Sequence, residues 1–275
     1  MKPTDKIAVI HGVLTVVDIS LTKIISILSV MGLEVSPIPS IRCAPKEMST
    51  TCETEKVELE DYIEQCRKML KEENVIFKTI LIGNLGYDCA VDSTARFVNS
   101  FPSATVVIQP YFANRGKCYE GFDLNYVERI KQLISIADII TPNFTEACFL
   151  SGEEFKGEVS EWKILKICYN LEKIGAKNII ITDIPSEDKK TVKIAIFSNS
   201  KLEMISVEKL RGNYPDSGAI FTAVLTGAIE NKKSLKESVV IAEEFLKSCI
   251  LESNKHRYSN KEGLIYENSL KKIIK

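Results

Sequence analysis

The stretch Ile139-Ile140-Thr141-Pro142-Asn143-Phe144-Thr145-Glu146-Ala147 contains the structural step on which the predicted fold depends. The two isoleucines read as a short buried strand, and an apolar helical pattern runs from 144 to 150. Asn143 stands where a helix N-cap is expected, and Glu146 lies in the first turn, where the helix dipole favours a carboxylate. A buried strand that leads directly into a helix is the repeating unit of a parallel α/β sheet.

The same unit recurs along the chain. Short apolar runs predict buried strands at 6–10, 34–38, 79–82, 105–108, 139–140 and 178–181. Helical patterns predict helices at 20–31, 57–70, 91–101, 124–134, 144–150, 160–174, 218–229 and 235–251. Two further runs, 192–197 and 202–206, predict a hairpin at one edge of the sheet. Together they favour a doubly wound, mostly parallel central sheet with helices on both faces and any ligand at the carboxyl ends of the strands.

Composition excludes several classes of protein. The 275 residues are 45% hydrophobic and 27% charged, with a formal net charge of -1, which allows a large core and implies no nucleic-acid partner. No apolar run is long enough to cross a membrane, and the N-terminus shows no signal-peptide core. The eight cysteines form no CxxC pair and there are two histidines, so we expect reduced, mostly buried cytoplasmic thiols and no zinc site.

No linker, repeat or low-complexity tract divides the sequence, and we therefore expect a single domain over residues 1–275. The polar, irregular residues 42–56 form the one insert between the predicted elements. This insert is a candidate lid or disordered loop.

A second stretch, Gly212-Asn213-Tyr214-Pro215-Asp216-Ser217-Gly218-Ala219-Ile220-Phe221, leads into the predicted helix 218–229. The first N–H groups of a helix have no intrahelical partner and bind phosphate readily, and Ser217 and Gly218 are small enough to let a phosphate approach. Asp216, however, adds a negative charge at this place, and Ala219 cannot accept a proton. The simpler alternative is a helix that is merely capped by Asp216 or Ser217.

Further motifs occur in a fixed order along the chain, which are His11-Gly12, Ser20-Leu21-Thr22, Gly86-Tyr87, Pro110, Gly116-Lys117, Tyr119 and Ala137 to Asn143. In the order of these motifs the chain resembles the ribokinase-like superfamily and, within it, the pyridoxal/pyridoxine kinase branch, which is related to the hydroxymethylpyrimidine kinases. The resemblance covers nearly the whole chain. It implies ATP- and Mg²⁺-dependent phosphorylation of the 5′-hydroxymethyl group of a vitamin B6 compound, in a cytoplasmic homodimer.

The resemblance also implies roles for individual positions. It assigns nucleotide or phosphate contacts to Asn143, Glu146, Thr182, Ser217 and Gly218, a metal contact to Glu146, and substrate contacts to His11, Leu14 and Tyr87. Each surviving position has a plainer interpretation as well. Asn143 and Glu146 can be an ordinary cap and first-turn carboxylate, His11 a packed histidine, and Thr182 a strand-end hydroxyl.

The chain departs from the family pattern where the family carries its chemistry. The position of the catalytic aspartate is Ala219, and the first glycine of the same turn is Asp216. Both carboxylates of the Asp-Pro-Val-Met-Gly-Asp segment are missing, at Gln109 and Asn114. Other departures fall at 14–18, at 44–48 and at Asp183. Loss of a general base alone typically lowers a rate by about 10²–10⁴-fold.

Two functions from different classes follow. The first is a kinase-family protein whose kinase activity is lost or strongly reduced, and which binds a pyridoxal-like small molecule or a protein partner. The alternative is an active pyridoxal or hydroxymethylpyrimidine kinase that uses a substitute base such as Asp216, with Asp18 as a second local carboxylate. A sugar kinase has less support, because the polar residues that hold a sugar are not evident in the sequence.

Overall fold

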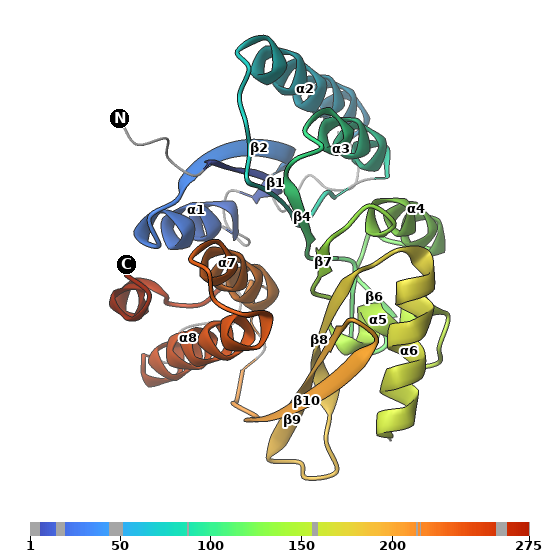
Figure 1. Ribbon diagram of the computed structural model, residues 1–275, viewed down its shortest axis with the longest axis vertical. Helices are drawn as coiled ribbons and strands as arrows, with labels where there is room; N and C mark the ends of the chain where they lie inside the picture. Colours follow the sequence, from blue (N-terminus) through green and yellow to red (C-terminus); the bar gives the residue numbers. More distant parts are fainter. Residues whose placement is uncertain are drawn as a thin grey trace.

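The fold is built on one eight-stranded sheet (Figure 1), in a computed structural model that describes residues 6–14, 20–43, 52–86, 88–155, 159–212, 214, 216–256 and 263–274. The strand order is β10-β9-β8-β7-β4-β3-β1-β2. Neighbours from β2 to β8 pair in parallel, whereas β9 pairs antiparallel with both β8 and β10. The strands are β1 (Lys6–Leu14), β2 (Glu34–Cys43), β3 (Thr79–Ile82), β4 (Thr105–Ile108), β7 (Ile139–Ile140), β8 (Asn178–Pro185), β9 (Thr191–Ser198) and β10 (Lys201–Glu208).

Helices cover both faces of this sheet (Figure 1). One face packs against α1 (Ser20–Val30), α7 (Ser217–Glu230) and α8 (Leu235–Lys255). The other packs against α2 (Cys52–Glu72), α3 (Cys89–Ser100), α4 (Leu124–Ile134), α5 (Phe144–Ser151) and α6 (Glu161–Ile174). The predicted doubly wound, mostly parallel fold is confirmed.

Alternation along each strand explains why the strands read as continuous apolar runs. In β1, Ile7 and Val9 pack toward the α1 and α7 face, whereas Ala8 and Ile10 pack toward the opposite face. Both sets are fully buried. Successive side chains of a strand point to opposite faces, so a strand covered on both sides needs apolar residues at every position.

Some local structure was not predicted. A two-residue pair, β5 (Ala113–Asn114) with β6 (Lys117–Cys118), follows β4, and a short 3₁₀ helix, η1 (Glu267–Lys272), packs near α8. Both are too short to show a periodic pattern. Regular structure also reaches into the predicted insert 42–56, because β2 continues through Cys43 and α2 begins at Cys52. Residues 44–51 lie outside the described residues.

Two composition-based expectations can be compared with the structure. The thiols of Cys66, Cys148, Cys168 and Cys249 are free and buried, as predicted, and that of Cys118 is partly exposed. No helix in the described part of the chain combines the length and apolarity needed to cross a membrane.

Candidate functional site

A cleft of about 650 Å³ opens where the carboxyl ends of β4, β7 and β8 meet the start of α7 and one side of α8. This is where ligands bind in open α/β sheets. Five of the predicted site residues line it, which are Asn143, Glu146, Thr182, Ser217 and Gly218. The cleft also contains side chains without a role in the sequence-based prediction, among them Arg115, Lys189, Lys209 and Glu243.

The start of α5 forms one wall and is closed by a complete capping box. The Asn143 side chain accepts a hydrogen bond from the Glu146 N–H at 3.0 Å, and Glu146 Oε2 accepts one from the Asn143 N–H at 2.9 Å. Asn143 Nδ2 donates to the Ala113 carbonyl at 2.8 Å, and Glu146 Oε1 accepts from the Phe112 N–H at 3.2 Å. The cap predicted at Asn143 is confirmed, and it also ties α5 to the segment after β4.

Burial dominates the chemistry of Glu146. Its side chain is 2% exposed, and this desolvation raises its pKa to about 8, although the backbone N–H groups that it accepts act in the opposite direction. Both carboxylate oxygens are already hydrogen-bonded within the protein. Glu146 therefore acts in this structure as a buried cap and cross-link.

The start of α7 is organised differently. Asp216 occupies the N-cap position but makes no capping hydrogen bond with its side chain. Instead, its Oδ2 forms a buried ion pair with Lys23 of α1 and accepts a hydrogen bond from the Leu264 N–H at 3.0 Å. Lys23 also donates to the Leu264 carbonyl at 3.0 Å. Gly263 allows this packing, because a Cβ there would lie 2.7 Å from both Asp216 Oδ2 and Lys23 Nζ.

The next turn of α7 is held against the sheet. Ala219 is 5% exposed and packs in the apolar core of the α1, α7 and α8 face. One turn later, Thr222 Oγ1 lies 2.8 Å from Thr141 Oγ1 at the end of β7. Gly218 faces Gln109, since a Cβ on Gly218 would lie 3.0 Å from Gln109 Nε2. The helix start thus has a glutamine amide beside it, while the Ser217 N–H donates to the Tyr214 carbonyl at 3.2 Å.

Thr182 and Asp183 lie at a bulge in β8, where the pairing with β9 changes register between Ile181 and Ile184. Thr182 bridges to Asn143, and its N–H donates to the Pro142 carbonyl at 3.0 Å. Asp183 has a φ of 57°, a left-handed conformation that favours glycine.

The Asp183 carboxylate remains accessible from the cleft, but the protein around it desolvates it. This desolvation raises its pKa, and the positive charges of Lys209 and Arg115 oppose the rise. Glu243 of α8 lines the same cleft. Burial, followed by repulsion from Asp183, raises the pKa of Glu243 to about 7, against the opposing effect of Lys247.

Of the three predicted substrate contacts, the structure describes only the side chain of His11, which does not line this cleft. His11 is 2% exposed, its Nδ1 lies 3.0 Å from the Gly12 carbonyl oxygen, and its ring packs so closely on Gly83 that a Cβ there would lie 2.1 Å from Cδ2. Its interpretation as a packed histidine is thereby favoured. Leu14 ends β1, with its side chain outside the described residues. Tyr87 lies outside them altogether.

The described residues do not form an all-protein site for a divalent cation. Hard cations need several free oxygen ligands. Both oxygens of Glu146 are occupied by backbone N–H groups. Within the described ranges, no three His, Cys, Asp or Glu side chains are grouped so that they could hold a metal ion.

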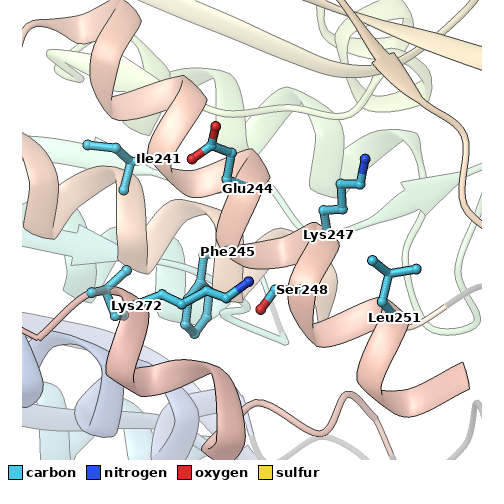
Figure 2. A pocket seen from close by; sticks show the side chains of 8 residues that line it. Ile241, Glu244, Phe245, Lys247, Ser248, Leu251 and Lys272 are labelled. Atoms are coloured by element: carbon cyan, nitrogen blue, oxygen red, sulfur yellow. The ribbon is translucent and has the colours of Figure 1, made fainter. Parts of the chain in front are cut away.

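A second, smaller cavity of about 360 Å³ lies between α8 and the C-terminal 3₁₀ helix (Figure 2). Its lining is Ile241, Glu244, Phe245, Lys247, Ser248, Leu251, Lys272 and Ile273. It contains none of the predicted site residues and lies away from the carboxyl ends of the strands. We therefore take the larger cleft as the candidate site.

The sequence prediction missed Lys23, which turns Asp216 into a structural residue. A signal was available, because Lys23 lies three residues after Ser20 and four before Ile27, on the apolar side of the predicted helix 20–31. A lysine on that side is buried only with a partner. Its partner lies 193 residues away, and no local pattern identifies it.

The sequence of this chain is similar to those of known small-molecule kinases. The sequence matches the family described as phosphomethylpyrimidine kinase over residues 43–264. A hydroxymethylpyrimidine/phosphomethylpyrimidine kinase of Haemophilus influenzae is 27% identical over 179 residues, which is 62% of this chain and 63% of that protein. A pyridoxine kinase of Bacillus subtilis is 23% identical over 59% of this chain and 60% of that protein. The chain thus spans about three fifths of the length of these relatives.

Solved structures match over more of the chain. A Bacteroides thetaiotaomicron protein, provisionally assigned as a phosphomethylpyrimidine kinase and crystallised with pyridoxal, superposes with a TM-score of 0.89 and 27% identity. The match covers 98% of this chain and 96% of that protein. The pyridoxal kinase of Lactobacillus plantarum superposes with a TM-score of 0.85 at 22% identity, over 98% of this chain and 96% of that one, which supports the fold.

Proposed function

This chain belongs to the phosphomethylpyrimidine kinase family, and we propose that it is a small-molecule-binding member whose phosphoryl-transfer activity is lost or strongly reduced. The observation that carries the proposal is the start of α7. The position of the family's catalytic aspartate is Ala219, which is packed in the core. The nearby carboxylate, Asp216, is paired with Lys23.

Geometry supports the loss of a general base. Such a base has to reach the hydroxyl that it deprotonates, within hydrogen-bond distance or through one water. Asp216 is 1% exposed, and its Oδ2 already meets Lys23 and the Leu264 N–H.

Family resemblance and the pyridoxal bound to the Bacteroides protein suggest the first ligand to test. We propose that this chain binds pyridoxal or a related hydroxymethyl heterocycle without phosphorylating it at kinase rates. The assay is the formation of phosphorylated product from pyridoxal and, separately, from hydroxymethylpyrimidine, with Mg²⁺ and ATP. We expect turnover far below the roughly 1–100 s⁻¹ that is common for kinases, and turnover within that range would refute the proposal.

One observation favours the alternative of an active kinase with Asp216 as substitute base. Asp216 Oδ1 is buried and has no hydrogen-bond partner among the described residues. If this oxygen takes the proton, Asp216→Asn abolishes turnover while the folded protein still binds ligand. Turnover that survives in a folded Asp216→Asn variant removes Asp216 from that role.

Two remaining expectations accompany the family assignment. We propose a cytoplasmic homodimer, as the resemblance implies. Light scattering during size-exclusion chromatography tests the dimer, for which a mass near 62 kDa is about twice the 30.8 kDa of the chain. A mass near that of one chain would contradict it.

A further inference from the structure

We propose that the cleft at the start of α7 selects an uncharged, hydroxyl-bearing ligand over a polyphosphate, and that Gln109, Asp183 and Glu243 set this selectivity. The inference rests on the proposed function, because a working kinase has to bind a nucleoside triphosphate in this cleft. It goes further by naming the class of ligand that the cleft disfavours, a polyphosphate, and the residues that set this preference.

Gln109 has a buried side-chain oxygen that favours a ligand with a hydrogen-bond donor. It follows β4 and is 6% exposed, yet it lines the cleft. Its Nε2 donates to the Pro110 carbonyl at 3.2 Å, whereas its Oε1 has no partner among the described residues. A buried acceptor without a donor is unfavourable and gains from any ligand that brings a hydrogen. An ionised phosphate oxygen brings none, and it repels the Gln109 oxygen.

The neighbouring helix start supplies the complementary group. Of the first N–H groups of α7, that of Ser217 donates to the Tyr214 carbonyl at 3.2 Å, whereas those of Gly218 and Ala219 have no acceptor inside the helix. Gly218 and the Gln109 amide are adjacent, as the 3.0 Å separation between a Gly218 Cβ and Nε2 shows. A hydroxyl group can accept from a helix N–H and donate to Gln109 Oε1 at the same time.

The charged side chains that line the cleft disfavour a polyphosphate. Four acidic side chains line the cleft, those of Glu146, Asp183, Glu208 and Glu243, together with three basic ones, those of Arg115, Lys189 and Lys209. Burial raises the pKa of Glu146 to about 8 and that of Glu243 to about 7, so these two contribute negative charge mainly above neutral pH. Arg115 and Lys209 act directly on Asp183, so part of the positive charge is already balanced within the protein. A site for a triphosphate needs excess positive charge, because the ligand brings several negative charges. The lining of this cleft has none.

The position of the two acidic side chains sharpens this argument. Asp183 follows Thr182 at the carboxyl end of β8, and Glu243 comes from α8. Each carboxylate repels a further negative charge placed beside it, as Asp183 already repels the carboxylate of Glu243. A phosphate chain bound in this cleft would share its lining with both carboxylates.

The test is a calorimetric titration of the full chain with adenosine, AMP, ADP and ATP, at pH 8 and with and without Mg²⁺. These four ligands share one ring system and the 2′- and 3′-hydroxyls of the ribose, and they differ at the 5′ position, which carries a hydroxyl in adenosine and one, two or three phosphates in the others. We expect affinity to fall with each added phosphate, so that adenosine binds at least about tenfold more tightly than ATP. Tighter binding of ATP than of adenosine would overturn the proposal, and so would the absence of binding by all four.

Variants separate the effect of the charged side chains from that of Gln109. The double variant Asp183→Asn with Glu243→Gln removes two negative charges. We expect it to lower the ratio of the adenosine affinity to the ATP affinity by about tenfold or more. Gln109→Leu removes the acceptor that has no partner. It should weaken the binding of adenosine by about fivefold to tenfold and change the binding of ATP little. Glu244→Gln is the matched control, because Glu244 follows Glu243 on α8 but lines the other cavity (Figure 2). It should leave the ratio unchanged, and an equal effect of control and double variant would contradict the proposal.

A product assay run alongside keeps the two proposals distinguishable. Tight ATP binding without turnover overturns the ligand selectivity and leaves the proposed loss of activity standing. Turnover at ordinary kinase rates overturns the proposed function itself.

Discussion

The starts of α5 and α7 both face the cleft, and they satisfy their polar groups in opposite ways. At α5, the side chain of Asn143 and both oxygens of Glu146 are hydrogen-bonded to backbone groups. At α7, the side chain of Asp216 makes no capping hydrogen bond and forms a buried ion pair with Lys23 instead. Asp216 Oδ1 and the neighbouring Gln109 Oε1 have no partner among the described residues.

This difference shows why a surviving family residue is not by itself a surviving function. Asn143 and Glu146 remain in place, and helix capping is sufficient to explain both. The α7 start has Ala219 where the family resemblance implies a carboxylate, and the buried Asp216 Oδ1 there has no hydrogen-bond partner among the described residues. Ligand binding is expected where the protein leaves polar groups unsatisfied. Substitutions at the two helix starts test this contrast.

Lys23→Met should be the most destabilising of the single changes, because it leaves the buried carboxylate of Asp216 without its counter-ion. Breaking a buried pair in this way lowers the free energy of unfolding by about 3–5 kcal/mol. Urea denaturation measures this change in the free energy of unfolding. The control is Lys6→Met, which breaks a pair with Glu34 whose side chains are 38% and 44% exposed, and should cost less than about 1 kcal/mol.

A double variant, Lys23→Met with Asp216→Leu, should recover most of that loss, since neither charge then remains buried. If Lys23→Met costs no more than the exposed control, the ion pair does not hold the α7 start, and the contrast with α5 loses its basis.

Asn143→Ala should have a smaller effect. It removes the cap of α5 and the bond to the Ala113 carbonyl, and we expect a loss of about 2 kcal/mol. Ser160→Ala, at the cap of α6, removes only an exposed capping bond and should cost about 1 kcal/mol or less. Equal losses in urea denaturation would mean that the α5 cap does not act as a cross-link.

Glu243→Gln should change the pH dependence of stability with little effect at low pH. The pKa of Glu243 is raised from 4.5 to about 7, so the folded protein binds more protons than the unfolded chain between these values. Stability therefore falls as pH rises from about 4.5 to 7, with a slope of up to about 1.4 kcal/mol per pH unit.

Removing the carboxyl group should flatten that slope and leave the variant more stable than the parent above pH 7. Thermal unfolding between pH 4 and 8 measures this. Glu244→Gln is again the control, and unchanged slopes in both variants would show that Glu243 is not desolvated in the cleft.

The cores of most elements could be predicted from the sequence. Strands 79–82, 105–108 and 139–140 and helix 124–134 have the predicted bounds, because their apolar runs end where the chain leaves the core. The bounds of α2 and β2 were missed at the ends that meet in the polar stretch 42–56, where no apolar pattern marks a limit. In the site, Asn143 was predicted as a cap from the adjacent helical pattern, and the structure confirms it.

Local pattern alone determined the doubly wound α/β fold, the capped start of α5 and the absence of a carboxylate at Ala219, because each depends on residues close together in the chain. Tertiary structure decided what Asp216 and Gln109 do. Lys23 and Asp216 are 193 residues apart, and Leu264 joins them from the far end of the chain. Whether a buried polar group is paired or left open depends on which distant segments pack around it, and that is fixed only when the chain folds.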